Sequence, residues 1–284
     1  MERYFIIAGT VVRIIGKDQE TLLNSEILKK FEVQPQPWDF EIECQVVKEF
    51  PLPKGSCVYR SHGKRVFSCE EEQITYVGAV EHSLDGARSC VIRNGQKSRA
   101  FFKEKDFIKG IPTGSVLELV ESEHLAVAKG GFILHASCVE YEGVAIVFTG
   151  PSGIGKSTQA DLWKSHRNAK IINGDRIMLL PDSEDCQAIG IPFCGSSGIR
   201  ENKILPLAAV ICLEQAPDNK IRNLSGFEAF RRIWGECTLQ TWNREEIAGC
   251  TDAIERLINQ KKIFHLSCTP DIRAVEAAEA LLEK

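Results

Sequence analysis

The sequence predicts a fold of the α/β or α+β class, preceded by a strand-rich N-terminal region. From Phe132 onward, short apolar runs with strand character alternate with longer segments of helical periodicity, which is typical of mixed α/β domains. Before about residue 110, short apolar and β-branched runs instead follow one another, separated by the turn-forming stretches PLPKG, LDG and RNG. We therefore expect two domains, 1–110 and 111–284.

In the first domain, the runs with strand character lie at 4–15, 40–47, 57–60, 74–80, 90–92 and 100–102. A helix is predicted between them at 20–31. The glycine- and proline-containing stretch KGIPTGSV, at 109–116, is the expected domain boundary.

In the second domain, a helix is predicted at 116–129, ended by Gly130 and Gly131. The predicted strands are 132–138, 144–149, 169–173, 177–181, 188–191, 207–213 and 262–267. Further helices are predicted at 155–166, 227–234, 245–260 and 271–284.

The chain has 284 residues, 43% hydrophobic and 26% charged, with a formal net charge of −4. This composition is that of a globular protein, and it gives no support for a broad nucleic-acid-binding surface. None of the eleven cysteines forms a C-x-x-C pair, which favours reduced thiols over a disulfide framework or a zinc site. The N-terminus lacks a signal-peptide pattern, and no run reaches the roughly 18 apolar residues of a membrane span. We expect a cytoplasmic protein.

The stretch TGPSGIGKST, at 149–158, matches the pattern G-x-x-x-x-G-K-[ST] between an apolar strand and a helix. Glycines let backbone N–H groups turn toward phosphate oxygens, and the helix N-terminus adds partial positive charge. Lys156 is expected on the β- and γ-phosphates and the Ser157 hydroxyl on Mg²⁺. The sequence thus predicts an ATP site with magnesium, formed by Gly150, Ser152, Gly153, Ile154, Gly155, Lys156, Ser157 and Thr158.

The segment before this loop, HASCVEYEGVAIVFTG, predicts a β-hairpin. If Glu140 and Gly143 face each other across a two-residue loop, His135 lies opposite Phe148, beside the mouth of the loop. From the residues alone, His135 has two interpretations: a partly buried histidine bonded to backbone, or a site residue.

A second candidate follows the helix, in AKIINGDRIMLL. Phosphoryl transfer needs a carboxylate near the γ-phosphate, as a metal ligand or as the acceptor of the substrate's proton. Asp175 is the first carboxylate after the helix to follow a strand. Because N-G-D is also an ordinary turn sequence, a purely structural role is the equal alternative.

Together, LHASCVEYEGVAIVFTGPSGIGKSTQADLW and IINGDRIML resemble the catalytic domain of HPr kinase/phosphorylase, which shares its fold with phosphoenolpyruvate carboxykinases. The resemblance covers about residues 115–215 and none of the first 110. It implies that His135, Lys156 and Asp175 are catalytic and that Ser157 and Asp175 hold the metal. It also places Arg176 at the nucleotide.

The chain departs from this family at two places. Gly174 stands where the family has the first Asp of an Asp-Asp-Arg corner, so Asp175 serves alone or with Asn173 or Glu214. The stretch that supports phosphorolysis is replaced by IGIPFCGSSGIRENKILPL, which puts that reaction and the protein HPr as acceptor in doubt. In this stretch, Arg200 or Lys203 either balances charge on the transferred group or belongs to a solvated loop.

The sequence thus favours an ATP-dependent kinase that acts on a hydroxyl of a protein or peptide serine or of a small molecule. The alternative is a non-catalytic nucleotide-binding regulator, because one carboxylate is missing. An enolate-phosphorylating carboxykinase needs a large additional domain for which the chain is too short. The N-terminal domain is expected to bind the acceptor or a partner protein, and the resemblance is compatible with a homo-oligomer.

Overall fold

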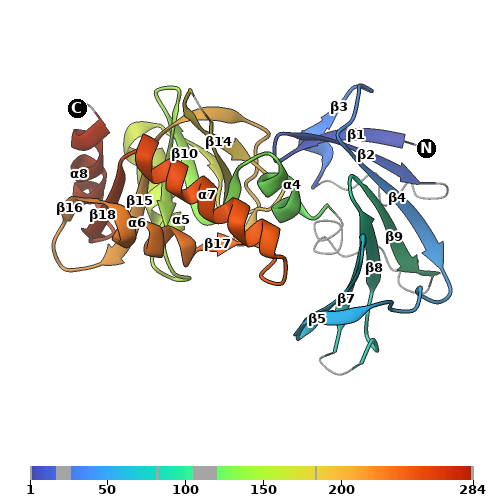
Figure 1. Ribbon diagram of the computed structural model, residues 1–284. Helices are drawn as coiled ribbons and strands as arrows, with labels where there is room; N and C mark the ends of the chain where they lie inside the picture. Colours follow the sequence, from blue (N-terminus) through green and yellow to red (C-terminus); the bar gives the residue numbers. More distant parts are fainter. Residues whose placement is uncertain (1, 17–26, 81–82, 105–119, 183, 283–284) are drawn as a thin grey trace. The chain divides into compact units, whose positions relative to one another are not determined.

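The structure is a computed structural model that describes residues 2–16, 27–80, 83–104, 120–182 and 184–282 (Figure 1). The chain is a mixed α/β protein with two large sheets. It divides into two compact units, Met1–Ser122 and Glu123–Lys284. The expected domain boundary at 109–116 lies outside the described residues, as do residues 20–26 of the helix predicted at 20–31.

The first unit is a nine-stranded sheet with the strand order β3-β1-β2-β4-β9-β8-β7-β6-β5. Its pairings are antiparallel except for β2–β4 and β4–β9, which are parallel. The strands are β1 (Glu2–Ile7), β2 (Thr10–Gly16), β3 (Glu32–Val33), β4 (Phe40–Val47), β5 (Ser56–Ser61), β6 (Gly63–Cys69), β7 (Glu72–Ala79), β8 (Ser89–Asn94) and β9 (Lys97–Lys103).

Several features of the first unit differ from the sequence prediction. The run at 4–15 is two strands, because Ala8 and Gly9 both have positive φ angles, 51° and 68°, and turn the chain into a hairpin. Strands β3 and β6 were not predicted at all. Of the helix predicted at 20–31, the described part contains a 3₁₀ turn, Lys29–Phe31.

The second unit contains β10 (Phe132–Tyr141), β11 (Val144–Thr149), β12 (Lys170–Asn173), β13 (Arg176–Pro181), β14 (Cys186–Gly190), β15 (Ile204–Gln215), β16 (Lys220–Leu224), β17 (Cys237–Thr238) and β18 (Ile263–Cys268). Its described helices are α4 (Ser122–Ala128), α5 (Lys156–Arg167), α6 (Gly226–Trp234), α7 (Arg244–Gln260) and α8 (Ile272–Leu282). Every strand predicted here is present, whereas β16 and β17 were missed. The helix predicted at 116–129 begins only at Ser122, and its residues 116–119 are not described.

Two hydrophobic cores flank the sheet of the second unit. One contains Val147 of β11 together with residues of α6 and α7. The other contains Ile146 and Phe148 together with residues of α5 and α8. Successive residues of a strand point to opposite faces, so β11 is buried on both sides and its C-terminal end is firmly placed.

The long strands β10 and β15 exchange partners along their length. Strand β10 pairs with β13 and β17 up to His135, and with β11 and β12 from Ala136 onward. Strand β15 pairs first with β14 and then, in parallel, with β11 and β18. The strands β10, β13, β14, β15 and β11 consequently form a closed circuit.

The β10–β11 hairpin has a different register from the one predicted. Ser137, not His135, faces Phe148, because the two-residue turn consists of Glu142 and Gly143 rather than Tyr141 and Glu142. Both turn residues have positive φ angles, 50° and 82°, as a type I′ turn requires. The observed register differs from the predicted one by two residues. Because this shift is even, the His135 side chain stays on its expected face of the sheet.

All eleven cysteines are free thiols. Among the helices that the structure describes, none combines the length and the apolar character that a membrane span requires.

Candidate functional site

The glycine-rich loop joins the end of β11, Thr149, to the start of α5, Lys156. Gly150, Gly153 and Gly155 have φ angles of 141°, 80° and 113°, which side chains disfavour. The first N–H groups of a helix have no partner within it, and the first turn of α5 carries no acidic residue. This end of α5 is thus suited to an anion such as a phosphate group.

Lys156 lies inside the curve of this loop, with 7% of its surface exposed. Its Nζ donates hydrogen bonds to the carbonyl oxygens of Gly150, at 2.7 Å, and Pro151, at 3.1 Å. Burial lowers the pKa of Lys156, and the carboxylates of Glu236 and Asp175 oppose that change. The ammonium is therefore positioned by backbone carbonyls, within the electrostatic reach of two carboxylates.

Asp175 lies in a corner between β12 and β13, two strands that both pair with β10. The corner is built on Asn173, which is fully buried. Its Oδ1 accepts hydrogen bonds from the N–H groups of Asp175, at 2.9 Å, and Arg176, at 3.0 Å. The N–H of Ala136 donates to the Asp175 carbonyl at 2.9 Å. These bonds fix the backbone of Asp175 beside the point where β10 changes partners.

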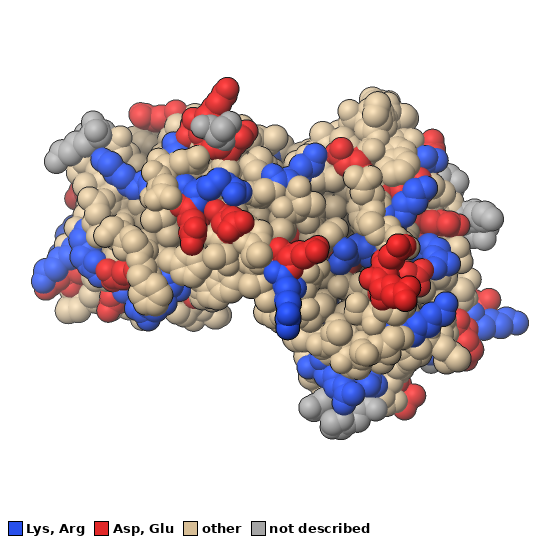
Figure 2. All heavy atoms as spheres, in the orientation of Figure 1, with Lys and Arg blue, Asp and Glu red and all other residues tan. Residues whose placement is uncertain are grey.

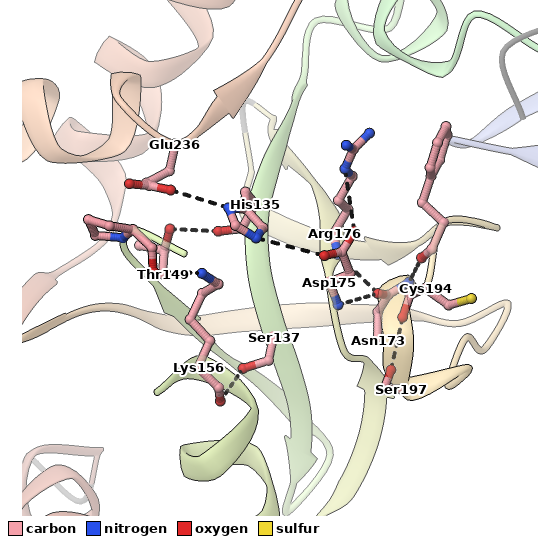
Figure 3. Close-up of polar contacts among 12 residues, drawn as sticks. His135, Ser137, Thr149, Lys156, Asn173, Asp175, Arg176, Cys194, Ser197 and Glu236 are labelled. Carbon is pink, nitrogen blue, oxygen red and sulfur yellow. Dashed lines mark hydrogen bonds and ion pairs between the residues drawn. The ribbon is translucent and has the colours of Figure 1, made fainter. Parts of the chain in front are cut away.

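His135 lies between two carboxylates (Figure 3). Its Nε2 is 3.7 Å from Oδ1 of Asp175, and its Nδ1 is 3.4 Å from Oε2 of Glu236. Thr149 at the end of β11 donates a hydrogen bond from Oγ1 to the His135 carbonyl at 3.0 Å. The side chain is partly buried, with 31% of its surface exposed, and its ring nitrogens lie near carboxylates rather than backbone groups.

Glu236 is a site residue that the sequence analysis missed. It lies between α6 and β17, and its carbonyl accepts a hydrogen bond from the His135 N–H at 2.9 Å. The pairing of β17 with Ile133 and Leu134 of β10 brings it there from about one hundred residues along the chain. No motif surrounds Glu236, so only this long-range pairing reveals it.

Arg176 follows Asp175 and stays close to it. Its Nε is 3.5 Å from Oδ2 of Asp175, and its guanidinium carbon is 4.8 Å from the centre of the Phe193 ring. A second contact, 3.9 Å long, joins it to Glu123. Arg176 thus contacts Oδ2 of Asp175, whereas His135 contacts Oδ1.

The segment Cys194–Gly198 packs against the corner and fills the space beside Gly174. A Cβ atom on Gly174 would lie 2.2 Å from Oγ of Ser197. A Cβ atom on Gly195 would lie 2.8 Å from Cβ of Asp175. Ser197 is itself held by a 2.9 Å hydrogen bond to the Cys194 carbonyl. There is consequently no room for a second carboxylate at position 174.

Of the other predicted candidates, Arg200 lies beside the corner. It forms an isolated β-bridge with Asn173 and donates a hydrogen bond to Sγ of Cys194 at 3.0 Å. Lys203 pairs with Glu140 of β10, and Glu214 pairs with His265 of β18 at 2.7 Å. Among the described residues, no contact joins Lys203 or Glu214 to Asp175.

The donors near the loop fit Mg²⁺ better than a transition metal. The described residues contain no group of three or more His, Cys, Asp or Glu side chains that could hold a metal ion. The Ser157 hydroxyl is exposed at the start of α5, and the Asp175 carboxylate is 30% exposed. Mg²⁺ is commonly bound by one or two protein oxygens together with phosphate oxygens and water, and the hydroxyl of Ser157 and the carboxylate of Asp175 are oxygen donors of this kind.

No family model and no curated protein matches the sequence. Among solved structures, the Hpr(Ser) kinase/phosphatase from Coxiella burnetii aligns with 53% of this chain and 92% of its own, at 13% sequence identity and a TM-score of 0.30. Such a score marks a distant structural neighbour and carries no argument about activity.

Proposed function

We propose that this protein is an ATP-dependent phosphotransferase, which moves the γ-phosphoryl group to a hydroxyl of a protein or peptide serine or of a small molecule. One observation carries the proposal: Lys156 in the glycine-rich loop lies within the electrostatic reach of Asp175 and Glu236, which flank His135. A buried cation, an anion-binding helix end and a restrained carboxylate are the groups that phosphoryl transfer requires.

In this proposal, the loop and the start of α5 bind the triphosphate through backbone N–H groups and the Lys156 ammonium. Ser152 and Thr158 are exposed at the loop, where their hydroxyls can contact phosphate oxygens. The full set of binding residues is Gly150, Ser152, Gly153, Ile154, Gly155, Lys156, Ser157, Thr158, Arg176 and Arg200. Ser157 and Asp175 would hold Mg²⁺, which neutralises charge on the β- and γ-phosphates when bound.

The acceptor hydroxyl oxygen forms a bond to the γ-phosphorus as the bond to the β–γ bridging oxygen breaks, and ADP leaves. Asp175 accepts the hydroxyl proton. His135 orients the Asp175 carboxylate through Nε2, and Glu236 orients the imidazole through Nδ1. Arg176 and Arg200 would balance charge on the transferred group. Arg176 contacts Phe193 and Arg200 contacts Cys194, so both lie against the same segment.

The second candidate function is a nucleotide-binding regulator without catalysis. The observation that favours it is the packing of Ser197 against Gly174, which leaves the corner with a single carboxylate. Such a protein would bind MgATP but transfer its γ-phosphoryl group neither to an acceptor nor to water.

The test measures binding and transfer separately. Calorimetric titration with MgATP measures binding by the native chain, Asp175→Asn and Asp161→Asn. Single-turnover transfer from γ-labelled ATP is then measured for the same three proteins, with a cell extract as the source of acceptors. Asp161 is exposed on α5 and serves as the control for the same chemical change. We expect Asp175→Asn to bind MgATP and to lose about 10²- to 10⁴-fold in transfer rate.

Transfer by Asp175→Asn at the native rate would show that Asp175 is not the proton acceptor. Tight binding by the native chain without any transfer or hydrolysis would favour the regulator.

A further inference from the structure

A pocket of about 380 Å³ lies beside the glycine-rich loop. Its walls come from Gly153 of the loop, Gln159 of α5, and Ala216 and Cys268, which lie at the ends of β15 and β18. Strands β11, β15 and β18 are parallel to one another, so the pocket lies at their carboxyl ends. This is the edge at which open α/β sheets bind ligands, and the volume falls in the range of roughly 300–1,000 Å³ typical of small-molecule sites.

The pocket adjoins the loop, because Gly153, Ile154 and Gly155 are among its lining residues. Hydrogen bonds connect its walls. Gln215, at the end of β15, donates from Nε2 to the carbonyls of Gly153, at 3.1 Å, and Ile154, at 3.3 Å. Ala216 donates its N–H to the Cys268 carbonyl at 3.1 Å, which closes the gap between β15 and β18. A molecule bound at the loop can therefore extend into the pocket.

Gln159 lines this pocket and carries a buried hydrogen-bond acceptor. It shares the buried face of α5 with Lys156, Ala160 and Trp163, at helical spacing, and only 2% of its surface is exposed. Its Nε2 donates to Sγ of Cys268 at 3.4 Å, whereas its Oε1 has no hydrogen-bond partner among the described residues. A buried carbonyl oxygen without a donor is costly, which points to a ligand that supplies the donor.

We propose that this pocket binds the base of the nucleotide whose phosphates the loop holds, and that Oε1 of Gln159 accepts a hydrogen bond from the exocyclic amino group of adenine. The inference rests on the proposed function, since it assumes a nucleoside triphosphate at the loop. Hypoxanthine carries a carbonyl oxygen where adenine carries this amino group. It would place a second acceptor against Oε1, so the pocket discriminates between the two bases.

The experiment titrates the full chain with MgATP, MgITP and magnesium tripolyphosphate. We expect the native chain to bind MgATP about tenfold more tightly than MgITP, the loss that an unpaired buried acceptor typically causes. Gln159→Leu should abolish the difference between the two nucleotides and leave tripolyphosphate binding unchanged. Gln187→Leu, the same change on β14, should behave like the native chain.

A second variant keeps the test informative if Gln159→Leu fails to fold. Ala216→Trp, at the half-buried rim, fills the pocket and should reduce binding of both nucleotides to the affinity of tripolyphosphate. Equal affinities of the native chain for MgATP, MgITP and tripolyphosphate would overturn the base pocket but leave the loop as a phosphate site. Failure of all three to bind would overturn the proposed function and this inference with it.

Discussion

The two sheets of this protein differ in how their strands use their neighbours. In the first unit, each described strand keeps the same one or two partners along its length. In the second unit, β10 pairs with four strands and β15 with three. The candidate site residues gather where β10 exchanges partners, so the proposed chemistry would take place where the regular pairing of the strands is interrupted.

The two units also differ in the surroundings of a buried cation. In the first unit, Nε of Arg93 is 3.0 Å from the carboxylate of Glu121, and both side chains are largely buried. In the second unit, Lys156 donates to backbone carbonyls, and no described carboxylate lies within ion-pairing distance of it. On the face shown in Figure 2, Lys and Arg side chains intermingle with Asp and Glu. The informative difference is thus in the buried charges: one is already neutralised, and the other is available to a ligand.

The largest effect is expected when the two buried cations, Arg93 and Lys156, are each replaced by methionine. Arg93→Met should lower the free energy of unfolding by about 3–5 kcal/mol, because it leaves Glu121 as a buried charge. Lys156→Met should leave the free energy of unfolding unchanged or higher, yet weaken MgATP binding by about 10- to 100-fold. Denaturant unfolding and calorimetric titration of both variants provide the measurements. A loss of stability in Lys156→Met comparable to that in Arg93→Met would remove the distinction.

A second experiment concerns the corner that interrupts the second sheet. Gly174→Asp should lower the free energy of unfolding by about 1–3 kcal/mol, because its Cβ would overlap Oγ of Ser197. The double variant Gly174→Asp, Ser197→Gly should recover most of this loss and supply a second carboxylate beside Asp175. Ser197→Gly alone is the control. A single variant as stable as the native chain would show that the corner has room.

A third experiment compares glycines. Three glycines have positive φ angles and open space around them: Gly95 in the first unit (56°), Gly143 in the β10–β11 turn (82°) and Gly153 in the glycine-rich loop (80°). A Cβ atom on any of them meets no other atom within 4 Å. Each change to Ala should cost about 1–2 kcal/mol of unfolding free energy through the left-handed backbone alone. Only Gly153→Ala should also weaken MgATP binding. Equal binding by all three variants would mean that the loop conformation is irrelevant to the ligand.

The smallest expected effect is a pH dependence. Because burial lowers the pKa of Lys156, its ammonium loses its proton at a lower pH than an exposed lysine does. MgATP affinity should therefore fall as the pH rises through that pKa, by at most about tenfold per pH unit. The free energy of unfolding should change in the opposite direction. At a pH between the lowered pKa of Lys156 in the folded protein and its ordinary pKa in the unfolded chain, Lys156 is protonated more in the unfolded chain, so the free energy of unfolding rises with pH. Titration at several pH values should show this decline in the native chain and its absence in Lys156→Met.

The parts of the site that sequence could predict are those encoded locally. The strand, glycines and lysine of 144–156 are contiguous, and their residue types specify a strand, a tight loop and a helix start. The mixed α/β character follows from periodicity in the same way. Asp175 could be proposed because a strand and a turn precede it directly.

The remaining features depend on conformations and pairings that composition does not encode. The hairpin register was wrong because Glu142 adopts a left-handed backbone that a glutamate rarely takes. Strand β6 was missed because Lys64 and Arg65 interrupt its apolar pattern. Glu236 reaches His135 only through the pairing of β17 with β10. The obstruction of position 174 by Ser197 likewise joins segments distant in sequence.

The closed circuit of strands β10, β13, β14, β15 and β11 has a consequence for how the acceptor of the proposed phosphoryl transfer would be recognised. Strand β13 is bonded to β10 on one side and β14 on the other, and His135 of β10 pairs with Arg176 on one side and donates its N–H to the Glu236 carbonyl on the other. An incoming polypeptide therefore cannot add a strand to β13, whereas β12 and β17 each pair, among the described strands, with β10 alone. If the proposed function holds, the hydroxyl of a peptide acceptor would have to reach Asp175 without backbone pairing to β13, a requirement that a small molecule meets as well.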